Sequence, residues 1–171
     1  ADFRAKIAEG IKMQLTPNCD YLFMKNVRKY VEEKVGELTF PEELLKRIMR
    51  NNNKDKDEKF IEDNFDMSVK ELKWSLIKNQ LVEAREIKIE DADVKNVAKA
   101  MARAQFAQYG MTNVPEEYLD KYAADMLKER KNIDMLVDRA VDQKLMEALK
   151  ATVKLNKKTI TLDEFNKLME A

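Results

Sequence analysis

The chain has 171 residues, of which 37% are charged and only three are Gly and three Pro. This length fits one large domain or two small ones, and a single domain over residues 1–171 is the simpler expectation. The composition favours an all-α fold. Lys and Arg total 32, as do Asp and Glu, so no net field attracts nucleic acid or an anionic membrane surface. We therefore expect protein or small-molecule partners, and neither nucleic acid nor a membrane.

The sequence contains no histidine, which removes Ser-His and Cys-His nucleophiles, the commonest general base and most zinc sites. Cys19 is the only cysteine and cannot form an internal disulfide, which fits a reducing cytosol. We interpret it as an incidental thiol at a helix start. No apolar run approaches the length of a membrane span, and no signal peptide opens the chain. These features favour a cytoplasmic protein that is not an enzyme and holds no metal or cofactor.

The first residues predict a broken helical rod. One narrow apolar stripe recurs every four residues and indicates a helix over 2–15: Phe3, Ile7, Ile11 and Leu15. Pro17 should interrupt or kink this helix, after which Asp20 can cap a second one. Gly36 should end the second helix in a left-handed conformation.

Pro41 and the acids that follow it predict the start of a third helix, which runs to about Arg50. Residues 51–57 have no apolar side chain, and their lysines would repel a cation, so we expect a solvated loop and no ion site. A helix over 58–85 follows, with a break near 64–66 left open. Its later part is apolar on two sides, with Leu72 on one and Trp74 on the other, and therefore needs two apolar partners.

Further helices are predicted from start and stop signals. Glu90, Asp91 and Asp93 should cap a helix rather than form a metal or catalytic pair, and Gly110 should end it. Pro115 opens the next helix, and another spans about 130–151. Residues 152–160 allow a short extended hairpin, and a capping box at 161–164 begins a final short helix.

The order of these pieces resembles the C-terminal domain of trigger factor, a bacterial chaperone. The resemblance rests on collinear segments over nearly the whole chain: FRAKI (3–7), LTFPEELL (38–45), LKWSLIK (72–78), IKIEDAD (87–93), AQFAQYG (104–110), DRAVDQKL (138–145) and TITLDEFN (159–166). It implies an elongated helical body with protruding helical arms around a cradle that holds unfolded or nascent polypeptides without ATP.

The resemblance also limits what is assigned to these residues. The family's ribosome-docking loop, Gly-Phe-Arg-x-Gly-Lys, is matched only superficially at 2–7, where both glycines are missing. We therefore expect ribosome contact only through a domain absent from these residues. Nothing here resembles the family's β-rich prolyl-isomerase domain, so that activity is not assigned either.

A client-binding patch is predicted at Phe106, Tyr109 and Met111. Phe106 lies half a turn from the face that Val97 should bury, and the other two flank Gly110, where a helix tip is accessible. Ten methionines add side chains that adapt to differently shaped apolar partners. The alternative is that a neighbouring helix covers this side of the helix.

Other classes of function stay open at this point. A periplasmic helical chaperone is the nearest alternative, a helical scaffold for one folded partner is second, and a carboxylate-only enzyme is third. A full-length gene with a signal peptide would select the first, and tight one-to-one binding of a folded protein the second. A weak homodimer is also compatible with the sequence.

Overall fold

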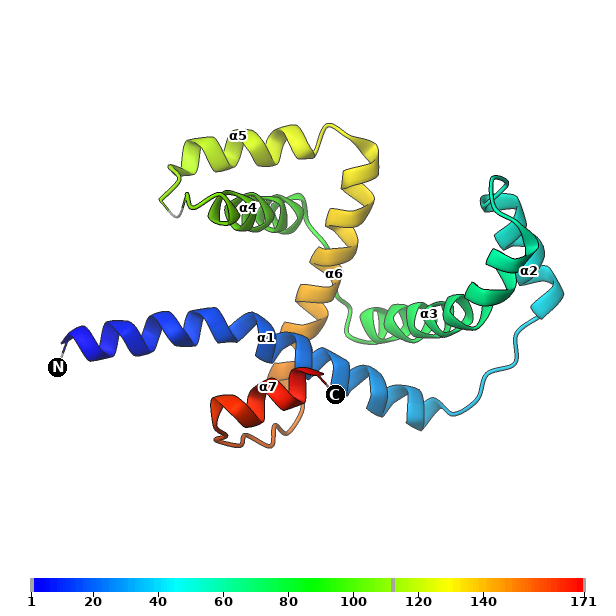
Figure 1. Cartoon of the computed structure of the whole chain (residues 1–171), viewed down its shortest axis with the longest axis horizontal. Helices are drawn as coiled ribbons and strands as arrows, with labels where there is room; N and C mark the ends of the chain where they lie inside the picture. Colours follow the sequence, from blue (N-terminus) through cyan, green and yellow to red (C-terminus); the bar gives the residue numbers. More distant parts are fainter. Residues whose placement is uncertain (1, 112, 171) are drawn as a thin grey trace. The chain divides into compact units, whose positions relative to one another are not determined.

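The computed structural model describes residues 2–111 and 113–170, and these residues form seven α-helices and no β-strand (Figure 1). The all-α prediction is confirmed. A hairpin was allowed at residues 152–160, but Thr152 ends α6 and residues 153–161 form an irregular connection without strand pairing. The chain divides into two compact units, each described by itself. The terminal unit comprises Ala1–Gln80 with Lys157–Ala171, and the middle unit comprises Leu81–Asn156.

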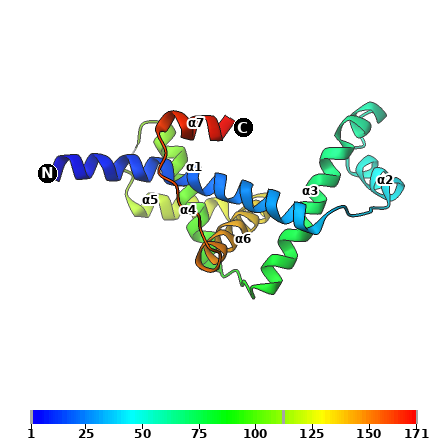
Figure 2. The ribbon, with the colours of Figure 1, turned by 90° about the horizontal axis from the view of Figure 1, so that it is seen from below.

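The terminal unit contains α1 (Asp2–Val35), α2 (Glu42–Asn52), most of α3 (Glu58–Ala84) and α7 (Leu162–Glu170). The last helix, α7, packs beside α1 (Figure 2). The short helix α2 folds back on the first half of α3, where the Lys46 ammonium lies 5.0 Å from the centre of the Phe65 ring. The Arg50 guanidinium closes this turn by bonding the Glu58 carboxylate.

The helix α1 is continuous through Pro17, so the predicted break is wrong. A proline removes only one donor from the ladder of backbone hydrogen bonds, and the bonds on either side continue the helix. The Thr16 hydroxyl donates to the Lys12 carbonyl at 2.8 Å in the same turn. As a result Cys19 and Asp20 lie inside a long helix and not at a helix start.

Two predicted features of the first long helices are resolved by the structure. Gly36 ends α1 with φ 73°, and its N–H donates to the Glu32 carbonyl at 3.1 Å, as a left-handed stop requires. The helix α3 shows no break at 64–66. The Asn64 amide donates to the Phe60 carbonyl at 2.8 Å, so this polar residue bonds the helix backbone and leaves the helix intact.

A polar junction fixes α3 to the C-terminal half of α1. The Arg28 guanidinium donates to both oxygens of the Glu71 carboxylate, at 2.8 and 3.2 Å. Its central carbon also lies 5.5 Å from the centre of the Trp74 ring. The Lys73 ammonium donates to the Gly36 carbonyl at 2.5 Å and so satisfies the end of α1. The apolar side of α3 that carries Trp74 thus faces this junction.

The middle unit packs α4 (Asp91–Gln108), α5 (Glu116–Met126) and α6 (Arg130–Thr152) around a small core (Figure 1). Six buried residues form this core: Val94, Val97, Ala98, Ala123, Leu136 and Ala140. Three of the six are alanine, whose small side chains allow the helix backbones to approach closely. The helices α4 and α5 therefore lie side by side as a hairpin, with α6 packed against α4.

The predicted caps are confirmed at two helix starts. The Asp93 carboxylate accepts the Glu90 N–H at 2.7 Å and pairs with the Lys144 ammonium at 2.5 Å. The Lys144 ammonium, followed by the Glu90 N–H, lowers the pKa of Asp93. At α7 the capping box forms as expected, with the Thr161 N–H donating to Glu164 at 2.8 Å and the Glu164 N–H donating back to the Thr161 hydroxyl at 3.3 Å.

Candidate client-binding surfaces

The tip of the α4–α5 hairpin is shaped by the way α4 ends. Gly110 has φ 78°, its N–H donates to the Ala107 carbonyl at 2.9 Å, and the Met111 N–H donates to the Phe106 carbonyl at 3.0 Å. This pair of bonds is the Schellman motif, in which the second residue past the cap contacts the last turn of the helix. The stop predicted at Gly110 is confirmed, and it returns the chain toward Phe106.

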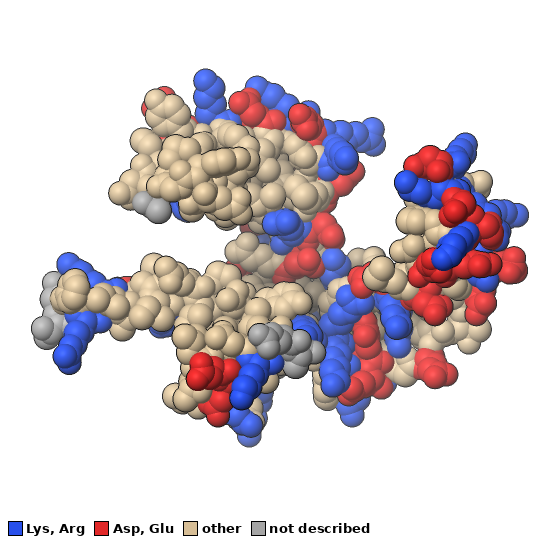
Figure 3. Space-filling view, in the orientation of Figure 1, with Lys and Arg blue, Asp and Glu red and all other residues tan. Residues whose placement is uncertain are grey.

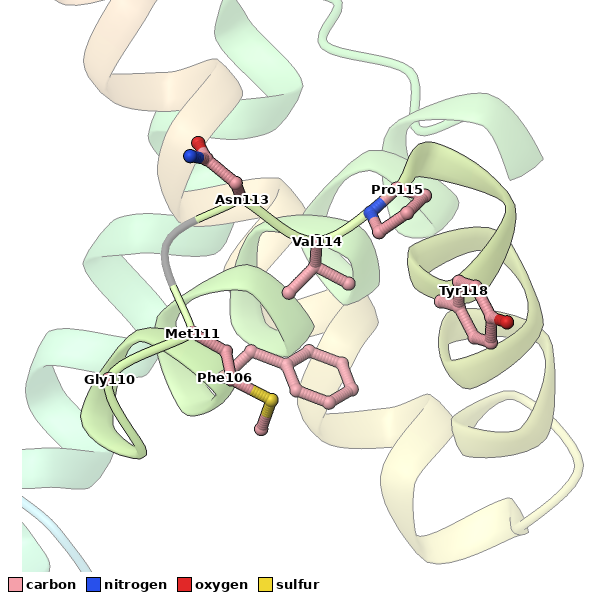
Figure 4. A pocket seen from close by; sticks show the side chains of 7 residues that line it. All are labelled: Phe106, Gly110, Met111, Asn113, Val114, Pro115 and Tyr118. Carbon is pink, nitrogen blue, oxygen red and sulfur yellow. The ribbon is translucent and has the colours of Figure 1, made fainter.

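A groove of about 520 Å³ opens at this tip, and we call it the tip groove (Figure 4). Its walls come from the end of α4, the connection and the start of α5: Phe106, Gly110, Met111, Asn113, Val114, Pro115 and Tyr118. In Figure 4 the Phe106, Met111 and Val114 side chains gather on one side, and Tyr118 stands on α5 beyond Pro115. None of the seven lining residues is charged, so the groove presents apolar surface with a polar margin.

The three residues predicted from sequence occupy different positions at the tip. Phe106 is half-buried and packs edge-on against the Tyr122 ring, with the ring centres 5.6 Å apart. Met111 is 49% exposed and lines the tip groove together with Phe106. Tyr109 is 73% exposed and does not line the groove. The structure therefore brings together two of the three residues.

The sequence reasoning missed other residues that line the groove, namely Val114, Pro115 and Tyr118. Pro115 was recognised only as a helix start. The available signal was Val114, an apolar residue next to that proline, together with Tyr118 in the first turn of α5. Tyr118 is 63% exposed, which separates it from the buried Leu119 beside it.

Ion pairs join α4 to α5 along another side of the hairpin. The Lys99 ammonium lies 2.9 Å from the Asp120 carboxylate and 3.2 Å from the Glu116 carboxylate. Lys95 also pairs with Asp120 at 3.2 Å, and Arg103 pairs with Glu116 at 2.5 Å. Hydrogen bonding to Lys99 is the main cause that lowers the pKa of both carboxyls. In Figure 3 the charged side chains of this hairpin gather along one edge and leave a largely uncharged face.

The terminal unit contains a second and larger groove, of about 850 Å³, between α1 and the segment that leads into α7. We call it the α1–α7 groove. Its walls are formed by one stripe of α1 and by residues near the C-terminus: Ala8, Ile11, Lys12, Leu15, Thr16, Cys19, Lys158, Thr159, Ile160, Thr161, Leu162 and Phe165. The stripe of α1 was recognised from sequence as a helix face, but its role in a groove was not predicted.

The hairpin of α2 and α3 carries a smaller apolar groove of about 200 Å³. Leu45, Ile48 and Met49 of α2 face Phe65, Val69 and Leu72 of α3 across it. This contact supplies an apolar partner for the second side of α3, as its two-sided pattern required. Ile48 remains 45% exposed, so the hairpin does not enclose all of its apolar surface.

Within residues 2–111 and 113–170 no group of three or more Cys, Asp or Glu side chains is arranged to hold a metal ion. Among the same residues, no helix is long and apolar enough to cross a membrane. The arrangements that the described residues do offer are apolar grooves between helices, each partly open to solvent.

Comparison with known proteins identifies the family. The model of the family described as "Probable trigger factor, C-terminal domain" matches residues 19–169, which is nearly the whole chain and includes parts of both units. No curated protein and no solved structure shows a significant match to the chain. The family suggests a chaperone-related role. With a helical fold, exposed apolar grooves and this match along its length, the chain belongs to the trigger factor C-terminal domain family.

Proposed function

We propose that the chain is a chaperone domain that holds unfolded or nascent polypeptides without ATP or a cofactor. The observation that carries this proposal is the tip groove, an uncharged apolar surface that is open at the end of a hairpin whose other residues pack into a buried core. An apolar groove of this kind binds side chains that a folded client would bury. The proposed activity needs no catalytic group.

Adaptability of the groove supports a broad range of clients. The Met111 side chain is unbranched and flexible, and it stands against the rigid Phe106 ring, so the groove can fit apolar side chains of different shapes. Exposed Tyr109 beside the groove adds aromatic surface that a longer client segment would cover. Selectivity for a single sequence is not expected from such walls.

The energetics favour reversible holding. Burial of one large apolar side chain contributes about 1.5–3 kcal/mol, and a few such anchors must first offset the loss of freedom on association. The remainder corresponds to dissociation constants of about a micromolar. A holder that must release its client requires weak binding of this order.

The organisation of the whole protein is also part of the proposal. One family model covers residues in both compact units, which supports a single chaperone domain over 1–171. We place its action in the bacterial cytoplasm, with ribosome contact through a different domain. A weak homodimer would be compatible with exposed apolar surface.

The test replaces two residues that line the tip groove, by Phe106→Ser with Met111→Ser. Thermal unfolding and suppression of aggregation of an unfolded client are measured on the same samples. Tyr30→Ser with Met67→Ser is the matched control, because these side chains are 61% and 60% exposed and line none of the described grooves. We expect the groove variant alone to lose suppression, with a melting temperature only slightly lowered by loss of the half-buried contact between Phe106 and Tyr122.

Two results would remove the tip groove from the proposed function. One is full suppression by the Phe106→Ser, Met111→Ser variant. The other is a collapsed melting temperature, which would mean that Phe106 serves the core of the hairpin through Tyr122. Tight one-to-one binding of a folded protein, without affinity for unfolded chains, would instead favour a scaffold.

A further inference from the structure

We propose that residues 157–170 form a strap that covers part of the apolar stripe of α1 and undocks on warming, before the rest of the chain unfolds. The strap consists of the irregular residues 157–161 and the helix α7, and it lies with α1 in the terminal unit. When docked, it limits the apolar surface that α1 presents. The inference goes beyond the holding function proposed above, which rests on the tip groove in the middle unit.

The helix α7 is too short to be stable without a partner. It has nine residues, and isolated helices shorter than about 12–15 residues are marginal in water. The capping box of Thr161 and Glu164 supports only its first turn. Its partner in the terminal unit is α1, beside which it packs (Figure 2). The stability of α7 therefore depends on its packing against α1.

This packing buries little apolar surface. Of the side chains described for residues 162–169, none is buried, and only Phe165 and Met169 are half-buried. Leu162 and Leu168 of the same helix are more than half exposed. By contrast, each helix of the middle unit contains a fully buried residue: Ala98 in α4, Leu119 in α5 and Leu136 in α6. Because the free energy that holds a helix in place grows with the apolar area it buries, α7 should open more easily than these three helices.

The strap covers one part of the apolar stripe of α1. Phe3, near the start of the stripe, is 76% exposed, whereas Leu15 is half-buried. Ile11 and Leu15 line the α1–α7 groove together with Phe165. When α7 leaves, this groove becomes an open apolar face of α1.

The chain on the N-terminal side of α7 allows the helix to leave. Residues 153–161, which connect α6 to α7, are exposed at every position and form no regular structure. Their backbone can change without loss of core contacts. Warming favours the released state, because undocking restores conformational entropy and gives up few apolar contacts.

Hydrogen exchange followed by mass spectrometry on the 171-residue chain measures the undocking. We expect exchange of the α7 amides to be slowed by less than about 100-fold relative to an unstructured chain, and that of core amides in α4 and α6 by more than about 1,000-fold. Phe165→Ser with Met169→Ser should bring α7 to the unstructured rate and leave α4 and α6 unchanged. Asn166→Ser with Lys167→Ser is the matched control, because both positions are exposed on the same helix.

Binding of the dye ANS distinguishes a strap from a chain end that merely frays. ANS binds exposed apolar surface. Its fluorescence should rise on warming, below the temperature at which α4, α5 and α6 unfold. Phe165→Ser with Met169→Ser should show the rise without warming. The addition of Ile11→Ser with Leu15→Ser should cancel it, because the newly exposed surface belongs to α1.

A covalent link tests whether undocking is required. Cys19, the only cysteine of the chain, and Leu162 both line the α1–α7 groove, so a flexible bismaleimide can join Cys19 to Leu162→Cys. The linked chain should lose the rise in ANS fluorescence on warming. The same variant with both thiols blocked by N-ethylmaleimide is the control and should keep the rise.

Three results would overturn the inference. Amides of α7 that are as protected as those of α4 would mean that α7 opens only when the whole chain unfolds. Unchanged or lower ANS fluorescence in Phe165→Ser with Met169→Ser would mean that α7 is a frayed end or a fixed wall of the groove. A rise that persists in the linked chain would place the exposed surface elsewhere. None of these measurements uses a client, so any of these results would leave the proposed holding function standing.

Discussion

Replacement of Arg28 by alanine should loosen the junction between α1 and α3. The change removes a two-bond ion pair with Glu71, an ion pair with Glu32 one turn along α1, and the contact with the Trp74 ring. The Arg28 and Glu71 side chains are 30% and 59% exposed, so the ion pairs are partly screened by solvent. We assign about 0.2–1 kcal/mol to the pair with Glu71 and about 0.5–1 kcal/mol to the ring contact.

The expected loss in the free energy of unfolding is therefore about 1–2 kcal/mol. Urea denaturation followed by far-UV circular dichroism measures it. The chain contains a single tryptophan, so the emission of Trp74 reports on this junction directly and should shift to the red when the guanidinium no longer covers the ring. High salt should also lower the free energy of unfolding of the wild type, because salt screens the ion pairs of this junction.

A double-mutant cycle with Glu71→Ala isolates the ion pair from the ring contact. The Arg28→Lys variant serves as a control, because lysine keeps the charge but cannot bond both carboxylate oxygens at once. It should retain only part of the coupling. A coupling free energy near zero between Arg28 and Glu71, together with unchanged Trp74 emission in Arg28→Ala, would refute the reasoning.

Three further predictions concern other parts of the chain. Glu86 has φ 51°, a conformation that disfavours side chains, so Glu86→Gly should raise the free energy of unfolding by about 0.5–1 kcal/mol in denaturant titration; a loss would contradict this. Folding lowers the pKa of Asp120 and Glu116 from ordinary values of 3.8 and 4.5, so their stabilisation is present above about pH 4.5 and is lost as pH falls through the lowered pKa values. The melting temperature of wild type should therefore fall more steeply below that pH than that of Asp120→Asn, and parallel curves would contradict the assignment. The 171-residue chain should neither accelerate prolyl isomerisation nor co-sediment with ribosomes, and saturable ribosome binding would refute the second part.

The sequence was sufficient where structure depends on a few neighbouring residues. Gly36 and Gly110 end their helices as predicted because only a residue tolerant of positive φ fits those positions. The capping box that starts α7 likewise needs only Thr161 and Glu164. The same local reasoning failed at Pro17, because a proline weakens a helix by one bond and the neighbouring turns determine whether the helix continues.

Exposure of the apolar side chains was decided only by the tertiary structure. Ala102 and Phe106 are one helical turn apart on α4, yet Ala102 is fully buried, whereas Phe106 is half-buried against Tyr122 of α5 and also lines an open groove. Two of the predicted residues, Phe106 and Met111, are brought together by the turn at Gly110, where the sequence predicted the end of the helix. The third, Tyr109, was left outside the groove by its position in that turn.

The sequence by itself determined the helices, most of their boundaries and the family resemblance, since these depend on periodicity, caps and the order of segments. The tertiary structure alone decided which stripes became core and which became grooves. The α1–α7 groove joins residues 8–19 to residues 158–165, which are far apart along the chain and carry no local signal of their contact. An apolar helix stripe shows only that the helix has apolar surface to bury. The packing of the chain determines whether another helix buries that surface or whether it stays exposed in a groove.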